Sequence, residues 1–518
     1  MKKTVMRIAT VVLSAVCLVG AYAGGSGEKK TEPPGGYGKA GTFPLAKQLV
    51  IKGGAGASAG GVVTDPNTML PYLKQLEKET NVKIEWTIYE NQDKVNIIFA
   101  AGDYPEFAFS TGLWSSLITS SAASGVVPDI LQYLGKGYTP NLDAVFAKYP
   151  DSLAYCKSPD GKLYSLPQLL RVEANYLEQN FMINKTWLDK LGLKVPTTTE
   201  ELKQVLIAFR DRDPNGNGKK DEIPFGFVAK DGFAQHLRAL YGIWGIPTKD
   251  GPIVRNGKVD YSATQPEFKE FIKYMNDLYN EKLIDVESFT QSVSQFDAKV
   301  DNAGGALYGF IIAQRGYTGT PGRNQFVSME PPKAPGHEPS MWVHPGYIAI
   351  KNFYFMTKKN KNPEYTMAWF DYVAQFDRSM QAMYGVLGEG VVAKDGKWTK
   401  NPDKPVAWFQ QNAWGEGWAG RLLDADILDK RWIPSAAEAY LADNYNRYYK
   451  QYKAKESWNR PEFTAEENKE VNTLRADLDA LWKNKEAEWI VSGKIDAEWD
   501  AFLQQMKTMK LDRYNALC

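Results

Sequence analysis

The sequence predicts an α/β protein, because strands and helices alternate along its first part. Residues 48–52 and 82–88 are rich in β-branched or aromatic residues, and the second run alternates apolar with polar positions. Between them, residues 69–80 place Leu70, Leu73 and Leu76 at helical spacing. A strand, a helix and a strand within about forty residues predict a parallel βαβ unit. Residues 106–110 supply a third strand.

Three later helices are predicted from one N-terminal signal, a threonine followed three residues later by a glutamate that can reach back to it. The pairs are Thr198 with Glu201, Thr264 with Glu267, and Thr464 with Glu467. Apolar residues at helical spacing follow each pair. The third helix is long, so the C-terminal fifth of the chain is predicted to be mainly helical.

Composition and charge exclude several classes of protein. The 518 residues are 43% hydrophobic and 24% charged, which is typical of a folded globular chain of two to four domains. After the N-terminus, no stretch approaches the ~20 apolar residues of a membrane helix. Lys and Arg number 62 against 61 Asp and Glu, so a nucleic-acid partner is disfavoured. Aromatic residues reach 13% while His number only 3, which favours apolar or stacking contacts over metal–histidine chemistry.

The N-terminus has the pattern of an export signal. Basic residues at positions 2, 3 and 7 precede an apolar run over 8–20 and an Ala-Tyr-Ala site that ends at Ala23. We expect residues 1–23 to be removed and 24–41 to form a flexible leader. Cys17 follows Val16, where a lipidated cysteine usually follows a small residue, so a lipid anchor stays open. The other cysteines, Cys156 and Cys518, could pair in an oxidising compartment, but we expect no disulfide framework.

The sharpest local motif is Asp-Pro-Asn-Gly-Asn-Gly-Lys-Lys-Asp-Glu at 213–222. Oxygen-bearing side chains recur at every second position and Gly218 stands at the sixth, where a calcium loop turns sharply. Position twelve is Pro224, so the usual closing glutamate is absent and the site would close early. The predicted ligands of a structural calcium ion are Asp213, Asn215, Asn217, the Lys219 carbonyl, Asp221 and Glu222. The alternative is a surface turn that binds nothing.

The sequence matches known catalytic motifs only weakly. Residues 56–60 match the G-x-S-x-G nucleophile pattern, but residues 61–66 do not start the helix that this motif needs, so we favour a flexible loop at the rim of a cleft. The sequence contains no H-E-x-x-H, phosphate-cradling G-x-x-x-x-G-K or C-x-x-C motif. A pair of glycosidase-like carboxylates stays open, because their separation is spatial.

Glycine-spaced tryptophans at 408, 414 and 418 are suited to stacking on sugar rings, although ordinary packing is the alternative. Trp114, Trp244, Trp342 and Tyr384 are further aromatic candidates, each individually favouring the core.

Several segments in order resemble the extracellular solute-binding proteins of ABC importers, in the oligosaccharide branch that includes alginate-binding proteins and LipO-like lipoproteins. The segments are Gly102–Glu106, Ser158–Pro167, Met182–Gly192 leading into Val195–Leu202, the loop at 213–222, Tyr384-Gly385, and Trp489–Gly493 with Trp499. The resemblance spans nearly all of the mature chain.

The resemblance implies a two-lobed periplasmic-binding-protein fold of type II-like topology, with discontinuous lobes joined by a hinge. We expect residues 42–172 with about 340–430 to form the first lobe, and residues 173–339 with about 431–518 to form the second, which carries the calcium-like loop. A ligand would close the lobes, and a membrane permease would recognise the closed form.

The leading hypothesis is therefore an exported, monomeric, periplasmic or cell-surface protein that captures an oligosaccharide and delivers it to ABC permease subunits. From the first lobe, residues 65–66, 111–114 and Gln168 would face the cleft. The full set of predicted ligand-binding residues is Trp114, Gln168, His236, Trp244, Arg315, Trp342, Tyr384, Trp414 and Trp418. The alternatives are a secreted glycan hydrolase or lyase, and a sensor that presents its ligand-bound state to a receptor.

Overall fold

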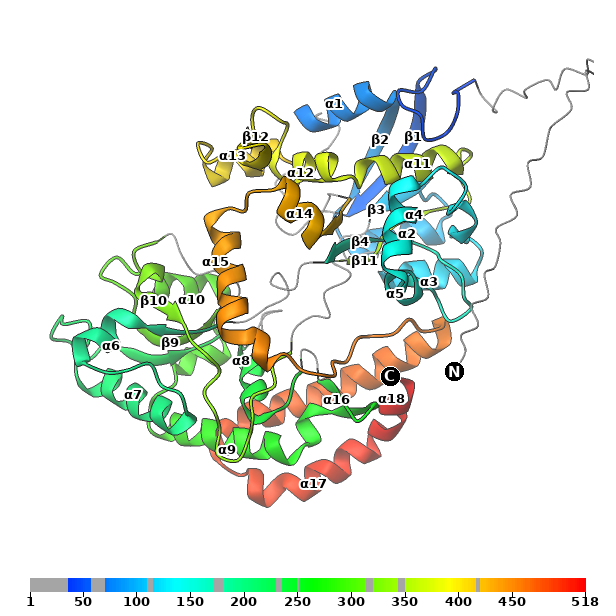
Figure 1. Cartoon of the computed structure of the whole chain (residues 1–518). Coiled ribbons are helices and arrows are strands. Elements are labelled where there is room, and N and C mark those ends of the chain that lie inside the picture. Colours follow the sequence, from blue (N-terminus) through cyan, green and yellow to red (C-terminus); the bar gives the residue numbers. More distant parts are fainter. Residues whose placement is uncertain are drawn as a thin grey trace, which may run out of the picture.

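Two α/β lobes make up the chain, and each is assembled from segments that are far apart in the sequence (Figure 1). A computed structural model describes residues 36–56, 70–109, 115–171, 180–229, 235–248, 251–313, 320–342, 350–415 and 420–518. The predicted export signal and most of the predicted leader lie outside these residues. No helix in these ranges is both long enough and apolar enough to cross a membrane.

The first lobe is built on a six-stranded sheet in the order β14-β4-β11-β3-β1-β2. Its strands are β1 (Leu49–Gly56), β2 (Val82–Tyr89), β3 (Phe107–Phe109), β4 (Leu166–Arg171), β11 (Ile350–Met356) and β14 (Leu422–Asp424). β1 pairs in parallel with both β2 and β3, and α1 (Pro71–Thr80) connects β1 to β2. The predicted βαβ unit and third strand are therefore confirmed.

Glycines continue β1 beyond the strand that the sequence predicted at residues 48–52, and residues 57–60 of the predicted rim loop lie outside the described residues. Gly53 to Gly56 continue β1, and a Cβ on Gly53 would lie 2.7 Å from Cγ2 of Ile84 and 2.9 Å from Cζ of Phe107. The glycine admits large side chains of the sheet core to the strand. Its role is close packing, which local composition does not reveal.

Helices cover the first-lobe sheet and enclose a core that draws on both halves of the chain. This core joins Leu49 and Phe107 to Phe353 and Trp369. The helices, besides α1, are α2 (Gln92–Ala100), α3 (Ser115–Ala123), α4 (Pro140–Lys148), α5 (Pro150–Cys156), α11 (Pro363–Val373), α12 (Phe376–Tyr384), α13 (Val406–Asn412) and α14 (Ala425–Arg431). A hairpin of β12 (Val391–Lys394) and β13 (Lys397–Lys400) lies beyond α12.

The second lobe has a four-stranded sheet in the order β10-β5-β9-β6. Its strands are β5 (Asn180–Asn184), β6 (Ile223–Gly226), β9 (Tyr308–Ala313) and β10 (Phe326–Ser328). β9 runs parallel to β6 and antiparallel to β5. A separate hairpin is formed by β7 (Pro252–Arg255) and β8 (Lys258–Tyr261).

The helices of the second lobe begin largely where their caps predict. Thr198 caps α7 by accepting from the Glu201 amide, while the Glu201 carboxylate accepts from Thr197, and Thr464 forms a full capping box with Glu467 at α16. The helices are α6 (Lys185–Leu191), α7 (Thr199–Asp211), α8 (Gln235–Ala239), α9 (Pro266–Asn280), α10 (Val293–Val300), α15 (Ala436–Asn444), α16 (Ala465–Ser492), α17 (Ile495–Thr508) and α18 (Leu511–Leu517).

The predicted cap at Thr264 is wrong. The hydroxyl of Thr264 donates to the Tyr261 carbonyl inside a short 3-10 turn, and α9 begins at Pro266 after the N-cap residue Gln265. Proline is favourable at the first helical position because it has no amide hydrogen to satisfy. The helix therefore begins two residues after Thr264.

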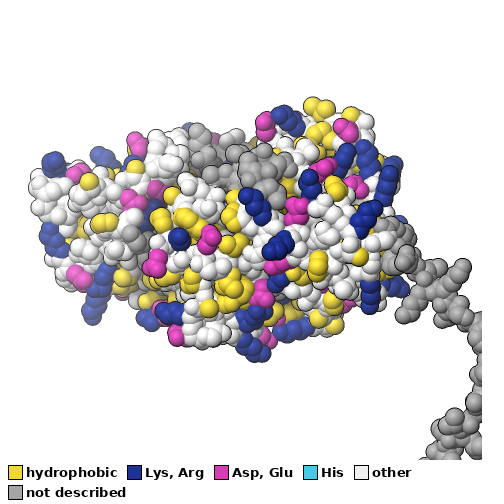
Figure 2. All heavy atoms as spheres, turned by 90° about the horizontal axis from the view of Figure 1, so that it is seen from above, with side chains coloured by type: hydrophobic (Ala, Val, Ile, Leu, Met, Phe, Trp, Pro, Cys, Tyr) yellow, Lys and Arg dark blue, Asp and Glu magenta, His cyan; other side chains and the backbone are white. Residues whose placement is uncertain are grey.

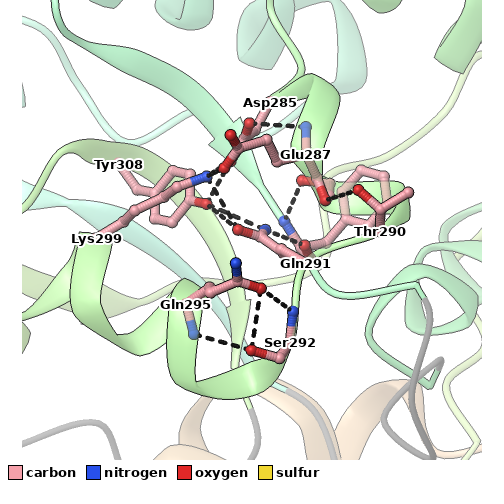
Figure 3. Close-up of polar contacts among 10 residues, drawn as sticks. Asp285, Glu287, Thr290, Gln291, Ser292, Gln295, Lys299 and Tyr308 are labelled. Carbon is pink, nitrogen blue, oxygen red and sulfur yellow. Dashed lines mark hydrogen bonds and ion pairs between the residues drawn. The ribbon is translucent and has the colours of Figure 1, made fainter.

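A polar network fastens α10 to the second-lobe sheet (Figure 3). The Lys299 ammonium lies 2.6 Å from carboxylate oxygens of both Asp285 and Glu287 and donates to Gln291 Oε1 at 3.0 Å. The Tyr308 hydroxyl, at the start of β9, donates to Asp285 at 2.5 Å. All three hydrogens of the ammonium have acceptors, so the charge is compensated although it is largely buried.

Several contacts join the lobes. Lys351 on β11 pairs with Glu462, which precedes α16, and the Tyr155 hydroxyl on α5 donates to the Arg460 carbonyl at 3.3 Å. Trp432 packs in a first-lobe cluster with Phe376, and α15 begins a few residues later. The segments 172–179 and 343–349 lie outside the described residues, so the exact lobe boundaries stay a prediction. Cys156 and Cys518 are both free.

Candidate functional site

The candidate site is defined by two sheet edges, one in each lobe: the edge at which β4 ends and the edge at which β5 begins. In the first lobe, β1, β3 and β4 are mutually parallel, so their carboxyl ends at Gly56, Phe109 and Arg171 share one edge. In the second lobe, the carboxyl ends of β6 and β9 share an edge with Asn180, the first residue of β5. Arg171, at the first edge, and Asn180, at the second, are only nine positions apart in the sequence. Ligands of open α/β sheets bind outside the carboxyl ends of the strands, which places the candidate site between these edges.

Gln168, a predicted ligand-binding residue, lies near the first-lobe edge on β4. It is fully buried, and its Oε1 accepts from Nη2 of Arg421 at 3.0 Å. Arg421 directly precedes β14 and is itself buried. Sequence reasoning missed this arginine, because its pairing with Gln168 depends on β14 lying beside β4.

A second charged group at this edge surrounds Asp424, the last residue of β14. Its carboxylate accepts from Lys148 at 2.6 Å, from the Tyr149 hydroxyl at 2.7 Å and from the Ile427 amide at 2.9 Å. Burial opposes ionisation, but these donors hold the pKa of Asp424 below its usual value. Arg171 lies 3.8 Å above the Tyr149 ring. The edge thus presents fixed charges of both signs, which suits a polar uncharged ligand.

Two of the predicted aromatic residues belong to the cores. Trp414 is 1% exposed and its ring lies 5.4 Å from those of both Trp86 and Phe109. Trp244 is 3% exposed and packs 5.4 Å from Phe271 in the second lobe. Both rings are packing residues in this conformation, the alternative that the sequence had left open for such tryptophans.

Of the remaining predicted residues, the two whose side chains the structure describes, Tyr384 and Trp342, belong to different lobes. Tyr384 stacks on Trp432 at a ring distance of 5.4 Å, near a surface groove between the β12–β13 hairpin and the start of α15. Trp342 is half-buried and directly follows Met341 of the second-lobe core. Residues 65–66, Trp114, Arg315 and Trp418 lie outside the described residues, as does the side chain of His236.

The calcium-like loop joins α7 to β6 at the end of the second-lobe sheet that is opposite to the candidate site. Asp213 accepts from the amides of Gly216, Asn217 and Gly218 at 2.9, 3.1 and 3.0 Å. The amide groups of Asn215 and Asn217 both reach the Asp221 carboxylate, at 2.7 and 2.9 Å. The side chains of positions 215, 217 and 221 therefore lie together through their amide nitrogens, while the Oδ1 atoms of Asn215 and Asn217 accept from the amides of Asn217 and Lys219 at 2.9 and 2.7 Å. A bound cation would take the place of these amide donors.

The electrostatics of this loop also fit a cation. Burial raises the pKa of Glu222, and the negative charges of Asp213 and Asp221 add to the shift. Glu222 Oε1 is buried and has no hydrogen-bond partner in the part of the chain that the structure describes. Among the described residues, no three His, Cys, Asp or Glu side chains form a metal-binding group, so a cation here would also need Asn oxygens and a backbone carbonyl.

No charge of one sign dominates the face that Figure 2 shows, where Lys and Arg side chains are interspersed with Asp and Glu. This agrees with the near balance of 62 basic and 61 acidic residues. Such a surface offers no continuous basic track for a polyanion.

Two discontinuous α/β lobes, with the candidate site at the carboxyl ends of their strands, define a two-lobed substrate-binding protein. The model of the bacterial extracellular solute-binding protein family matches residues 60–375, and the chain belongs to that family. It is a binding protein of the extracellular class and not an enzyme.

Two relatives indicate which branch of this family the chain resembles. The chain is 31% identical to the fructooligosaccharide ABC transporter substrate-binding protein FusA of Streptococcus pneumoniae, over 99% of this chain and 98% of FusA. It is 29% identical to lipoprotein LipO of Bacillus subtilis, over 42% of each chain. The predicted resemblance to the oligosaccharide branch is confirmed.

Solved structures agree. FusA in complex with kestose superposes with a TM-score of 0.75 and 28% identity, covering 90% of this chain and 97% of FusA. A second FusA structure is described as an EF-hand mutant with fructo-nystose, with a TM-score of 0.75, 27% identity and the same coverage. The alginate-binding protein AlgQ2 shares the fold, with a TM-score of 0.71 and 22% identity over 92% of this chain and 99% of AlgQ2.

Proposed function

We propose that this protein captures a fructooligosaccharide, or a closely related oligosaccharide, between its lobes and delivers it to the membrane permease of an ABC importer. The observation that carries the proposal is the match to FusA along 99% of the chain. The chain also covers 97% of a kestose-bound FusA structure. The likeness therefore includes both lobes and the connections between them.

The first-lobe edge supports a sugar ligand. Sugar hydroxyls both donate and accept hydrogen bonds, and they are best held by fixed groups of both kinds. The Gln168–Arg421 pair and the Asp424 network lie at this edge as buried polar groups bonded within the protein, so they give the edge a fixed polar framework. A ligand that contacts both sheet edges favours the closed state over the open one by its additional contacts, and closure is the signal that a permease can read.

The test is calorimetric titration of the purified mature chain with kestose, with maltotriose and a trigalacturonate as controls. We expect saturable one-to-one binding of kestose, with the sugar recovered unchanged by chromatography. Absence of heat and of any thermal shift with kestose, together with binding of a control sugar, would reassign the ligand. Import of kestose by the source cells, and its loss on deletion of this gene, tests delivery.

We further propose that the 213–222 loop holds a structural calcium ion. The ligands would be the side chains of Asp213, Asn215, Asn217, Asp221 and Glu222 with the Lys219 carbonyl. Support comes from the clustered loop side chains, the buried Glu222 oxygen and the EF-hand variant of FusA. When bound, the cation would compensate the carboxylate charges and fasten α7 to β6, away from the sugar.

The anchor and the oligomeric state are also proposals. We propose export by residues 1–23, with lipidation of Cys17 as the alternative to cleavage after Ala23; the LipO relative is described as a lipoprotein. The mass of the N-terminal peptide from cell membranes distinguishes a lipidated Cys17 from a free Gly24. We propose a monomer, which light scattering with and without kestose checks.

A further inference from the structure

Asn180 has an unusual side chain at the second-lobe edge of the candidate site. It is the first residue of β5 and pairs in the ladder with Ala313, the last residue of β9. Its side chain is fully buried, with 0% of the residue exposed. Neither the amide oxygen nor the amide nitrogen of Asn180 has a hydrogen-bond partner among the described residues.

The other end of the same strand shows what a purely structural asparagine does in this lobe. Asn184 lies four residues later, on the same face of β5, and is equally buried. Its Oδ1 accepts from the Trp187 amide at 3.1 Å and caps α6, while its Nδ2 donates to Gln325 at 3.2 Å. Buried amides are normally satisfied in this way, because an unmade hydrogen bond carries the full cost of desolvation. Asn180 is the exception, and it stands at the end where the strand meets the candidate site.

A second incompletely satisfied amide lies on α15, a helix whose run is attached to β5 at two places. Tyr440 on α15 lies 3.4 Å from Ser328 of β10, which pairs with Met182 of β5. Further along the same helical run, the Tyr449 hydroxyl accepts from the Phe181 amide at 2.6 Å. Asn444 lies between these two attachments, is 3% exposed, and its Nδ2 has no partner among the described residues.

We propose that Asn180 is a sugar-recognition residue whose amide donates to one ligand hydroxyl and accepts from another, with Asn444 as a second donor. This inference rests on the proposed function. An amide offers two donors and an acceptor with two lone pairs, which matches a pair of neighbouring hydroxyls on a sugar ring. Hydrogen bonds that the free protein leaves unmade are gained only with ligand, so they favour the liganded state. The site would discriminate against sugars that lack either hydroxyl, because the amide would then stay unpaired.

The alternative is that Asn180 holds an interior water and only supports the fold. The two roles predict opposite effects of Asn180→Leu, which keeps the approximate shape and removes the polar atoms. If Asn180 serves the ligand, the free protein should keep its melting temperature or gain about one to three degrees, because an unpaired polar group is lost. If it serves the fold, the free protein should melt at a lower temperature.

The experiment is calorimetric titration of wild type, Asn180→Leu, Asn180→Ser and Asn444→Leu with kestose, alongside thermal melts without sugar. We expect wild type to bind and Asn180→Leu to bind at least tenfold more weakly, with Asn180→Ser as the variant to use if the leucine protein does not fold. Asn184→Leu is the matched control, which should lower the melting temperature and leave the affinity of the folded fraction within about twofold. Kestose binding by Asn180→Leu and Asn180→Ser within twofold of wild type would overturn the inference. Failure of wild type itself to bind would instead refute the proposed function.

Discussion

Lys351 Nζ lies 2.9 Å from Oε1 of Glu462, and this ion pair joins the two lobes near the first-lobe edge of the candidate site, because the adjacent Ile350 pairs with Gln168. The side chains are only 16% and 19% exposed, and the ammonium also lies 3.8 Å from the Tyr155 ring. Lys351 belongs to β11 of the first lobe, whereas Glu462 precedes α16, whose core contacts are in the second. The pair is therefore a direct ionic contact between the lobes.

Replacing either partner of this pair should destabilise the protein. Glu462→Gln or Lys351→Met leaves the other charge partly desolvated, so we expect a loss of about 1–2 kcal/mol in unfolding free energy. Denaturant titration of both single variants and the double variant measures the coupling. Lys94→Met removes an exposed pair with Glu90 and should change little. A coupling near zero in the double-mutant cycle would contradict the structural role.

The Lys299 network predicts a larger effect within one lobe. Lys299→Met removes the cation that compensates Asp285, whose side chain is 7% exposed, and leaves it facing the Tyr308 hydroxyl. We expect a loss of about 2–4 kcal/mol, because one buried charge loses its partner. Lys185→Met, which breaks the exposed pair with Asp189, is the control. Equal unfolding free energies for these two variants would refute this account.

Gly53→Ala tests the packing of β1 against its neighbours. The new Cβ would meet Ile84 and Phe107 at 2.7 and 2.9 Å, so the sheet core must shift. We expect a loss of about 1–3 kcal/mol from overpacking. At Gly304 the nearest atom to a new Cβ is 3.4 Å away, so Gly304→Ala should be nearly neutral in the same melts. Similar melting temperatures for both variants would contradict this packing role.

Glu486 should make stability depend on pH. Burial raises its pKa from 4.5 to about 7, although Arg238 and the Tyr241 hydroxyl oppose the shift. Because the folded state holds this proton more tightly than the unfolded state, the contribution of Glu486 is lost as pH rises from about 4.5 to about 7, by up to ~3 kcal/mol. Glu486→Gln should flatten the curve in that window. Glu488→Gln on the same helix is the exposed control, and a wild-type-like slope in Glu486→Gln would exclude Glu486 as the source.

Calcium should raise the melting temperature, and a chelator should reverse the increase, because a ligand of the folded state stabilises it by mass action. The double variant Asp213→Ala with Asn215→Ala should melt lower and lose this response. Asp189→Ala, in an exposed pair outside the loop, should keep it. If the wild-type melting temperature is the same with calcium and with chelator, the proposed site is refuted.

Local signals predicted much of the fold. The spacing of Leu70, Leu73 and Leu76 located α1, and the capping box of Thr464 with Glu467 located α16, because both signals act within one or two turns of chain. The cap at Thr264 failed because Pro266 offered a better start two residues later. Neighbouring residues compete to start a helix, so a single motif does not fix the residue at which the helix begins.

The candidate site was predicted less completely. Gln168 stays a prediction as a ligand-binding residue, and its partner Arg421, directly before β14, lies more than two hundred residues away in the sequence. Trp414 carried the same glycine-spaced signal as its neighbours and lies in the core, because the sheet face of Trp86 and Phe109 closes over it. Asn180 carried no local signal, since its unpaired amide becomes evident only when every neighbour is placed.

The sequence by itself determined the class of this protein: an α/β chain with an export-like N-terminus, balanced charge and a calcium-like loop in the order of the solute-binding family. These properties depend on composition, periodicity and short-range hydrogen bonds. Only the tertiary structure decided which aromatic rings are core, which glycines are packing positions and which polar groups stay unpaired at the sheet edges. Those outcomes depend on contacts between segments that the chain brings together from opposite ends, and no local pattern encodes them.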